Sequence, residues 1–339
     1  MEYNKLTYRI LIGTISLLFT LHSCIDNDVP IQKEKAIPIC WNVIPEEMKE
    51  GRTLINTTEN LQTACSTGGH AIGIWSAYTL GGIDTQHVLG NENGDVNLIY
   101  QPDQTQDWQK WSYGKTAYWI QGATYYFNAY FPMNGGLTNI QHTKDYIQGN
   151  YNTETTQTDL MVTRVTVPTS SHGSPVALPM RHALATVQFK FQMEAGSETV
   201  NVLKSFSLDK TLRTSANLNY TTGNITIDHW TDKKASANNR IYAWNSNTGI
   251  EFSVTDIANP YQGNDNDGHI LIIPQSCNDA PTFSCTIGTH TYENISLGTK
   301  LFEPGKNYIY LIKMKDNILN VNLHIKAWNE LDSSYDIIF

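Results

Sequence analysis

Charged residues are scarce in this chain, and their balance is acidic. Aspartate, glutamate, lysine and arginine make up 16% of the 339 residues, and the formal net charge is −9 at pH 7. Nucleic-acid binding depends on a basic surface, so this composition argues against a nucleic-acid partner. Downstream of the first two dozen residues, the sequence has no apolar run long enough to cross a bilayer as a helix.

Cysteine is also scarce, and its spacing excludes the common zinc sites. The cysteines are Cys24, Cys40, Cys65, Cys277 and Cys285. No two have the C-x₂-C spacing of a structural zinc site, so we expect no metal and no cofactor. Cys277 and Cys285 lie eight residues apart around a turn-like segment, which allows a local disulfide in an oxidising compartment. Free buried thiols are the alternative.

One acidic loop, Asn264–Gly268, invites a calcium interpretation but does not fit the pattern. An EF-hand loop needs oxygen ligands at positions 1, 3 and 5, Gly at position 6 and Glu at position 12. With Gly268 at position 6, Gly263 falls at position 1 and Pro274 at position 12. The segment is therefore predicted to be a solvated hairpin tip.

The short motifs of common enzymes are missing as well. The mature chain has no H-E-x-x-H, no G-x-S-x-G, no P-loop and no G-x-G-x-x-G. Its histidines are scattered, and the paired carboxylates Glu46-Glu47 fall in a connector. A glycosidase pair assembled from distant strands stays open, but we expect no enzymatic activity.

The first 23 residues have the pattern of a secretion signal. Lys5 and Arg9 precede the apolar stretch Ile10–Leu21, which is too short for a permanent transmembrane helix. The following Leu21-His22-Ser23-Cys24 looks like a lipobox, which predicts lipidation of Cys24 and a tether over residues 24–35. Acyl chains contribute about 0.8 kcal/mol per buried CH₂, so two or more would anchor the protein in a membrane. Signal cleavage without lipidation is the alternative.

Strand patterns dominate the rest of the sequence. The cleanest is Ile318–Ala327, in which apolar and polar residues alternate. Further strands are predicted at Ala36–Ile44, His70–Tyr78, Val162–Val167, Ala185–Met193, Val202–Leu208, Ile270–Ile273 and Tyr308–Met314. Helical periodicity is nearly absent, with a single turn predicted at Thr57–Ala64. The pattern indicates an all-β protein of antiparallel sheets, arranged as two β-sandwiches in series.

Length and composition predict where these sandwiches divide. A mature chain of about 315 residues is comfortable for two domains of roughly 150 residues. The segment Thr169–Pro175 is rich in small and turn-forming residues and is the best linker candidate. We therefore expect an N-terminal domain at residues 36–177 and a C-terminal domain at residues 178–339.

Aromatic residues concentrate between Trp108 and Pro132. Within this stretch, Tyr125–Phe131 alternates so that aromatic side chains point to both faces of a strand. Such a strand contacts other elements on both sides, or has one buried face and one exposed face that binds a partner. We favour a core role for these aromatic residues; a platform for carbohydrate is the alternative.

Several short motifs resemble the fimbrillin (type V pilin, Mfa-like) family of surface lipoproteins. They are Trp111-Ser-Tyr113, Tyr118-Trp119, Tyr125-x-Phe127-x-Ala129-Tyr130-x-Pro132, Asp159-Leu160-Met161, His182-Ala183-Leu184-Ala185, Ile273-Pro274-Gln275, Pro304-Gly305-Lys306-x-Tyr308 and Ile325-Lys326-Ala327-Trp328. The resemblance covers most of the mature chain. It implies two tandem transthyretin-like β-sandwich domains, secreted as a lipoprotein and assembled into fimbriae.

The resemblance also implies a cleavage site after Arg52. In similar pilins, an Arg-specific protease cuts at this place, the lipidated first strand leaves, and a neighbouring subunit donates a strand to the opened groove. Here Arg52 follows the apolar segment Ala36–Ile44 across a polar connector. Lys49 is a competing basic site, and an ordinary loop role for Arg52 is the alternative.

The C-terminal segment is the candidate donor strand. Apolar residues recur at every second position of this segment, at Tyr335, Ile337 and Phe339. The alternative, which we favour, is that this segment is the last strand of its own domain. The chain ends only eleven residues after Trp328, which leaves little length for a donated extension. This argues against a stalk role and keeps an anchor, tip or accessory position open.

The sequence therefore predicts a structural or adhesive subunit of a fimbria at the cell surface. Its expected partners are other fimbrial subunits and the outer membrane, reached through the lipid anchor, with a host glycan or protein as a further partner. The alternative is a non-polymerising surface lipoprotein that binds glycan or host protein.

Overall fold

The structure is a computed structural model that describes residues 36–45, 57–90, 94–197, 200–262 and 268–327. The described residues from Pro38 onward belong to one structural unit. Within these ranges, no helix combines the length and the apolar character needed to span a bilayer.

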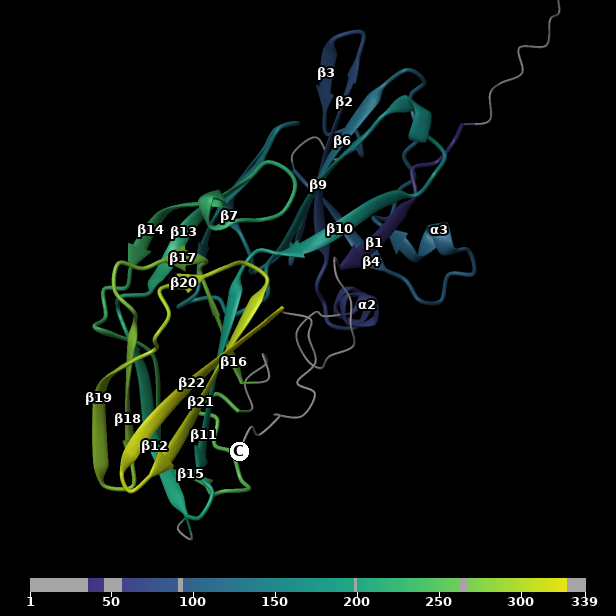
Figure 1. Cartoon of the computed structure of the whole chain (residues 1–339). Helices are drawn as coiled ribbons and strands as arrows, with labels where there is room; N and C mark the ends of the chain where they lie inside the picture. Colours follow the sequence, from purple (N-terminus) through teal and green to yellow (C-terminus); the bar gives the residue numbers. More distant parts are fainter. Residues whose placement is uncertain (1–35, 46–56, 91–93, 198–199, 263–267, 328–339) are drawn as a thin grey trace, which may run out of the picture. The chain divides into compact units, whose positions relative to one another are not determined.

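The regular secondary structure of the described chain consists almost entirely of strands (Figure 1). The strands of the first half are β1 (Trp41–Pro45), β2 (Ile72–Leu80), β3 (Ile83–Gln86), β4 (Val96–Tyr100), β5 (Trp111–Ser112), β6 (Thr124–Phe131), β7 (Thr138–His142), β8 (Ile147–Asn152), β9 (Met161–Val167) and β10 (Val176–His182). Those of the second half are β11 (Ala185–Met193), β12 (Asn201–Asp209), β13 (Arg213–Tyr220), β14 (Trp230–Ala235), β15 (Arg240–Phe252), β16 (His269–Ile272), β17 (Gln275–Ser276), β18 (Thr282–Ile287), β19 (His290–Ser296), β20 (Leu301–Phe302), β21 (Lys306–Lys315) and β22 (Ile318–Ala327). Helical structure is limited to α2 (Thr58–Ser66), α3 (Asp107–Lys110), η1 (Thr169–Ser171) and η2 (Ile227–His229).

The all-β prediction is confirmed, and so are most strand positions. The predicted strands Ala185–Met193 and Ile318–Ala327 coincide with β11 and β22. The first strand begins later than predicted, at Trp41, because Pro38 has no N–H to donate to a ladder.

The predicted helical turn is also present, as α2. The Thr57 side chain accepts a hydrogen bond from the Asn60 N–H at 3.0 Å and so caps the first turn of α2. Leu61 and Cys65 lie four residues apart on one face of α2, and both are buried.

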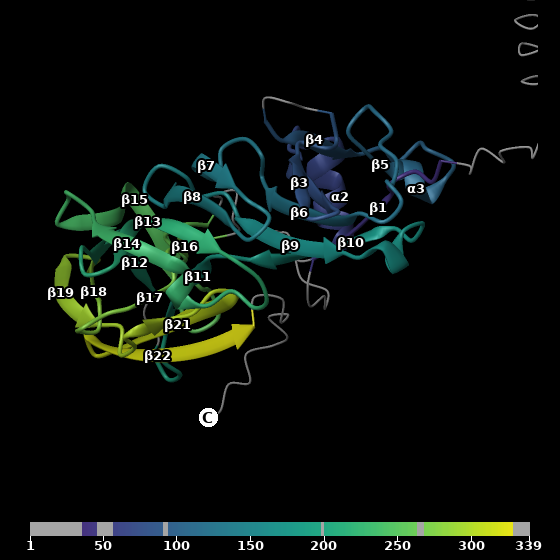
Figure 2. The same cartoon turned by 90° about the horizontal axis from the view of Figure 1, so that it is seen from above.

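An eight-stranded sheet forms the first half of the fold. Its strand order is β1-β10-β9-β6-β2-β4-β5, with β3 paired to β2. A second sheet, in the order β14-β13-β8-β7, combines strands from both halves of the sequence. Figure 2 shows the same strands from above.

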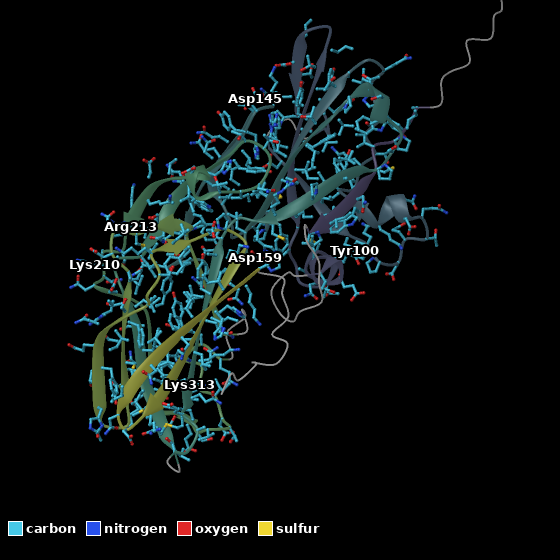
Figure 3. The ribbon with its side chains drawn as sticks, in the orientation of Figure 1. Tyr100, Asp145, Asp159, Lys210, Arg213 and Lys313 are labelled. Carbon is cyan, nitrogen blue, oxygen red and sulfur yellow. The ribbon has the colours of Figure 1, made fainter. Side chains whose placement is uncertain are left out.

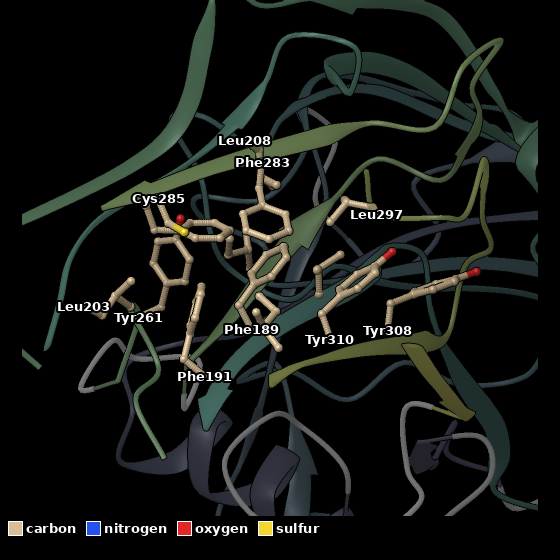
Figure 4. Packing of buried hydrophobic residues seen from close by; sticks show 14 of the residues in the cluster. Phe189, Phe191, Leu203, Leu208, Tyr261, Phe283, Cys285, Leu297, Tyr308 and Tyr310 are labelled. Atoms are coloured by element: carbon tan, nitrogen blue, oxygen red, sulfur yellow. The ribbon is translucent and has the colours of Figure 1, made fainter. Parts of the chain in front are cut away.

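The second half forms a sandwich of two four-stranded sheets. Their orders are β16-β11-β21-β22 and β15-β12-β18-β19. Phe189 from β11 packs against Phe206 from β12 with ring centroids 4.4 Å apart, and Phe206 stacks on Phe283 from β18 at 5.5 Å. Figure 4 shows Phe189 and Phe283 among the packed residues of this core. The aromatic residues therefore hold the two sheets of this sandwich together.

Strand β6 separates two apolar cores, as its alternating sequence predicts. Tyr125, Phe127 and Phe131 belong to a core with β1, α2 and β10, whereas Tyr130 belongs to a core with β8 and β13. Between them, the buried Asn128 donates hydrogen bonds to the carbonyls of Thr143 and Tyr146 at 2.8 and 3.0 Å. The prediction that this strand contacts other elements on both sides is confirmed.

The predicted domain boundary falls within a strand. Residue 177 lies in β10, which pairs with β1 and β9 of the eight-stranded sheet. The next strand, β11, lies outside that sheet and pairs with β16 and β21. The division at residue 177 and the transthyretin-like topology stay predictions.

Two of the sequence motifs meet at one buried point, which we call the junction (residues 159–161 and 182–185). The Nδ1 atom of His182 lies 2.9 Å from Oδ2 of Asp159, and both side chains are buried. Figure 3 labels Asp159. Next to this pair, the Ala183 N–H donates to the Leu160 carbonyl at 2.7 Å.

The junction also receives two later parts of the chain. The indole Nε1–H of the buried Trp230 donates to the Ala183 carbonyl at 2.9 Å. The Gly305 N–H donates to the Leu184 carbonyl at 2.8 Å. The junction is thus the point at which the eight-stranded sheet and the second half of the chain are fixed to each other.

We expect Asp159→Ala to destabilise the protein by about 3–5 kcal/mol, because it leaves a buried His182 without its carboxylate partner. Asp107→Ala is the matched control, since Asp107 pairs with Lys110 at 2.7 Å but is fully exposed. Urea denaturation should show a large loss of unfolding free energy for Asp159→Ala and none for Asp107→Ala. Equal effects would contradict the structural role of the junction.

A second aspartate–histidine pair holds an aspartate whose pKa is lowered, so we expect the stability to depend on pH. Oδ2 of Asp95 lies 3.0 Å from Nε2 of His142 and accepts a hydrogen bond from the Tyr130 hydroxyl at 2.9 Å. Burial by itself would raise the pKa of Asp95. The hydrogen bond and charge of His142, the Tyr130 hydroxyl and the charge of His87 outweigh burial, so this pKa lies below its ordinary value.

We expect the free energy of unfolding to fall as the pH falls below about 4, the ordinary pKa of an aspartate. In that range the unfolded state binds more protons than the folded state, so acid favours unfolding. Asp95→Asn should cost about 1–3 kcal/mol at pH 7 and progressively less toward pH 3. Urea denaturation at pH 7, 5 and 3 checks this, and a cost independent of pH would contradict it.

Candidate functional site

Strand β1 has the alternation of a strand with one buried face. Trp41, Val43 and Pro45 are buried, whereas Asn42 and Ile44 face outward, with Ile44 38% exposed. Trp41 meets Phe127 of β6 edge to face at a centroid distance of 5.1 Å. The inward side of β1 therefore completes the core beneath the eight-stranded sheet.

Strand β1 is an edge strand and is held by a single neighbour in that sheet. It pairs with β10 over five residues, from Trp41↔Val176 to Pro45↔Met180. This pairing is parallel, whereas every other pairing in the sheet is antiparallel. Parallel ladders are slightly less stable per residue, and an edge strand has half its backbone groups unpaired.

The residues just before β1 are fixed by a few backbone contacts. The Val176 N–H donates to the Cys40 carbonyl at 2.7 Å, and the Ile39 N–H donates to the Ala117 carbonyl at 2.8 Å. Pro38 forms an isolated bridge with Tyr118. These contacts extend the attachment of β1 without adding a second long ladder.

The inward side of β1 belongs to one apolar core that also contains Leu61, Trp111, Phe127, Val176, Leu178 and Met180. We use the name β1 groove for the apolar surface that this core would expose if β1 left. Burying an aliphatic or aromatic side chain contributes about 1.5–3 kcal/mol, so β1 owes most of its attachment to Ile39, Trp41 and Val43. Without β1, the groove would expose this apolar surface to water.

A cavity of about 450 Å³ adjoins the start of β1. Ile39 and Trp41 form one part of its lining, and Gln101, Gln104 and Gln109 contribute amide groups. The sequence did not predict this cavity, because its lining comes from segments more than fifty residues apart.

The described cysteines are protonated thiols in apolar surroundings. Burial raises the pKa of Cys40, and that of Cys65 and Cys285 to about 12. Burial also raises the pKa of Cys277 to about 11. Such thiols are poor nucleophiles at neutral pH.

Cys277 and Cys285 are both free in this structure. Cys285 lies within β18 and packs in the core of the second sandwich, whereas Cys277 follows β17 at the rim of that core. The disulfide between them stays a prediction for an oxidising compartment.

The other predicted site residues lie outside the described ranges. They are Cys24, Arg52 with its competitor Lys49, and the candidate donor residues Tyr335, Ile337 and Phe339. Most of the loop Asn264–Gly268 is outside as well, with only Gly268 described. Among the described residues, no group of three or more histidine, cysteine or acidic side chains could hold a metal ion.

The fold defines an all-β protein of several packed sheets, in which a short N-terminal strand closes an apolar core at a sheet edge. The chain belongs to the Fimbrillin-like family, whose model matches residues 57–328. Membership of this family supports a role as an adhesive surface protein.

Solved structures with similar folds include two proteins from Bacteroides species. A protein from Bacteroides uniformis described as a cell adhesion protein is 15% identical, with a TM-score of 0.50 over 87% of this chain and 99% of its own. A fimbrial protein from Bacteroides vulgatus is 14% identical, with a TM-score of 0.53 over 86% of this chain and 99% of its own. At these identities the similarity concerns the fold alone. No curated protein matches the sequence significantly.

We expect Trp41→Ala to destabilise the protein by about 3–5 kcal/mol, because it leaves a cavity over Phe127. Ile44→Ala is the matched control on the outward face of the same strand and should cost less than about 1 kcal/mol. Hydrogen exchange should show faster exchange at the Val176 N–H in the first variant only. Equal exchange in both variants would show that side-chain burial does not hold β1 in place.

Proposed function

We propose that this protein is a structural or adhesive subunit of a cell-surface fimbria, assembled by replacement of β1 with a strand from another subunit. The single observation that carries the proposal is that β1 is a five-residue parallel edge strand closing an apolar groove. If β1 leaves, the backbone groups of β10 lose their partners and the apolar pockets of the groove are exposed. A strand that alternates apolar side chains satisfies both.

Replacement is favoured when the incoming strand makes more contacts than β1. Strand β1 pairs with five residues of β10, so an incoming strand that pairs over more positions than these five would make more backbone hydrogen bonds than β1 does. An exposed groove costs about 25 cal/mol per Å² of apolar surface in water, which drives association once β1 has gone. Full strand pairing then makes dissociation slow.

Cleavage after Arg52 would release β1. The bond lies in the connector between β1 and α2, so after cleavage only non-covalent contacts would hold β1 on the body. The family match begins at residue 57 and so leaves both β1 and Arg52 outside the matched region. Lys49 lies in the same connector and would suit a protease of different specificity.

A lipid on Cys24 would place the precursor on the outer membrane before assembly. In this scheme the lipidated N-terminal segment stays with the membrane while the body joins the fimbria. The donor strand would come from the C-terminal segment of a neighbouring subunit, with Tyr335, Ile337 and Phe339 filling alternate pockets. If that segment is instead the last strand of its own domain, the protein fits an anchor, tip or accessory position.

The second candidate function is a non-polymerising surface lipoprotein that binds glycan or host protein. The polar cavity beside β1, lined by three glutamines, favours this function because it contains Ile39 and Trp41 and exists only while β1 is in place. Strand replacement destroys this cavity, whereas a stand-alone binding protein retains it. In neither scheme does the protein act as an enzyme.

We expect an Arg-specific protease to produce a new N-terminus at Thr53 and SDS-resistant ladders of the cleaved protein. Arg52→Ala should abolish both, and Lys49→Ala should leave both unchanged. N-terminal sequencing, gel electrophoresis and electron microscopy provide the measurements. A cleaved protein that remains a monomer would contradict strand replacement and favour the binding lipoprotein.

A further inference from the structure

The β2–β3 hairpin has two unlike faces. On one face, the Thr79 hydroxyl donates to the Asp84 carboxylate, and Nζ of Lys144 lies 3.0 Å from Oδ2 of Asp84. This face is covered by polar contacts, as expected for a hairpin at the surface.

The opposite face of the hairpin is apolar and uncovered. The register pairs Tyr78 with Thr85 and Leu80 with Ile83, so these four side chains share one face. Leu80 is 39% exposed and Ile83 is 72% exposed. Exposed apolar side chains gathered in this way mark an interaction site more often than isolated ones do.

Beside this face lies a cavity of about 350 Å³, which we call the tyrosine cavity. Its lining includes Tyr78, Thr85, Gln86, His87, Tyr118 and Ile120. No lysine, arginine, aspartate or glutamate is among the lining residues. Ligand sites of this size combine apolar and aromatic walls with a few polar groups that fix orientation.

The exposed ring in this cavity is carried on a fixed piece of backbone. The Tyr125 hydroxyl accepts a hydrogen bond from the Ile120 N–H at 3.0 Å and donates to the Tyr118 carbonyl at 3.4 Å. The Tyr118 side chain is 50% exposed. Its neighbour Trp119 is instead partly buried and stacks on His172 at 4.3 Å with an interplanar angle of 14°. The backbone is thus held while the Tyr118 ring stays accessible.

The polar groups of the cavity are available to a ligand. Among the described residues, the side chains of Thr85 and Gln86 make no hydrogen bond, and both residues are exposed. His87 has a φ of +54°, an uncommon conformation for a residue other than glycine, and its N–H donates to the Ser76 carbonyl at 2.7 Å. This turn places His87 at the cavity directly after β3.

We propose that the tyrosine cavity binds a neutral sugar, with the Tyr118 ring stacked on a pyranose face. Aromatic rings match the C–H groups of a sugar, whereas hydroxyl, amide and imidazole groups match its hydroxyls. None of the lining side chains is a lysine or arginine, and the Lys115 ammonium at the edge of the cavity donates to the Gly90 carbonyl at 3.3 Å. The lining therefore suits a neutral ligand better than a phosphate or carboxylate. An apolar peptide would leave the groups of Thr85, Gln86 and His87 without partners.

This inference rests on the adhesive part of the proposed function and assigns it a ligand class. None of the lining residues belongs to β1, but Pro38, just before β1, forms a backbone bridge with Tyr118, so sugar binding is measured on the uncleaved chain, before any strand replacement. Tyr118→Ala should form the same SDS-resistant ladders as the wild type after cleavage. A failure of sugar binding and a failure of assembly are in this way distinguishable.

Saturation-transfer NMR on the purified full chain tests the proposal, in a detergent without a sugar headgroup. The probes are neutral disaccharides built from glucose, galactose, mannose or N-acetylglucosamine, with glucuronic acid as the charged control. We expect transfer to the C–H protons of a neutral sugar and little to glucuronic acid. Tyr118→Ala should weaken binding by about tenfold or more, the loss expected for one stacked ring.

Three variants make the result specific. Tyr118→Phe keeps the ring and should bind within about threefold of the wild type, since a hydroxyl contributes less than a ring face. Gln86→Ala removes an exposed amide of the cavity and should weaken binding. Tyr292→Ala is the matched control, because Tyr292 is a partly exposed tyrosine of β19 that lies outside the cavity; its binding should be unchanged.

Three outcomes would overturn the proposal. The first is an absence of saturation transfer to every neutral sugar of the panel. The second is sugar binding that Tyr118→Ala leaves unchanged. The third is binding of an apolar fluorescent dye that Tyr118→Ala abolishes and no sugar displaces, which would assign the surface to an apolar peptide.

Discussion

The arrangement of the sheets depends on the buried pair of Asp159 and His182. Both side chains are removed from water, so each needs the other to be satisfied. The pair joins the residues before β9 to the end of β10, and β11 starts three residues after His182. The same few residues therefore fix the end of one sheet and the start of the next. Trp230 and Gly305 bind the carbonyls in between, so later loops are fixed to the same point.

Much of the secondary structure could be predicted from the sequence, because it leaves a local trace. The period-two alternation of β6, β11 and β22 gave their positions and, for β6, the two faces as well. The predicted helical turn Thr57–Ala64 falls on α2. These signals lie within about ten residues, and that is the range over which side-chain periodicity acts.

Pairing between distant segments produces no local pattern in the sequence. The parallel orientation of β1 against β10 and the joining of β8 to β13 are decided by cores assembled from many segments. The domain boundary near residue 177 was drawn from loop composition, which carries no information on strand partners. For the same reason the sequence could not distinguish the exposed Tyr118 from the partly buried Trp119, although the pair was recognised as a motif. The short distance between Asp159 and His182 could not be predicted either, although each residue lies in one of the sequence motifs.

The two candidate binding features of the first sheet differ in their physical character. The β1 groove is apolar and offers a complete backbone ladder, which suits a contact that is formed once and kept. The tyrosine cavity is small, uncharged and open, which suits a ligand that comes and goes. A fibre subunit has use for both kinds of contact. They meet in the chain near Pro38 and Tyr118, where the segment before β1 runs beside the segment that holds the exposed ring.

The position of β1 in the sequence has a consequence for the order of folding. Its only partner in the eight-stranded sheet, β10, begins at Val176, well over a hundred residues later. Contacts between such distant segments carry a large entropic cost and form slowly. The chain is synthesised from its N-terminus. Strand β1, with Trp41 and Val43, therefore cannot pair with β10 until most of the eight-stranded sheet has been synthesised. The first strand to be made is thus among the last of its sheet to be fixed.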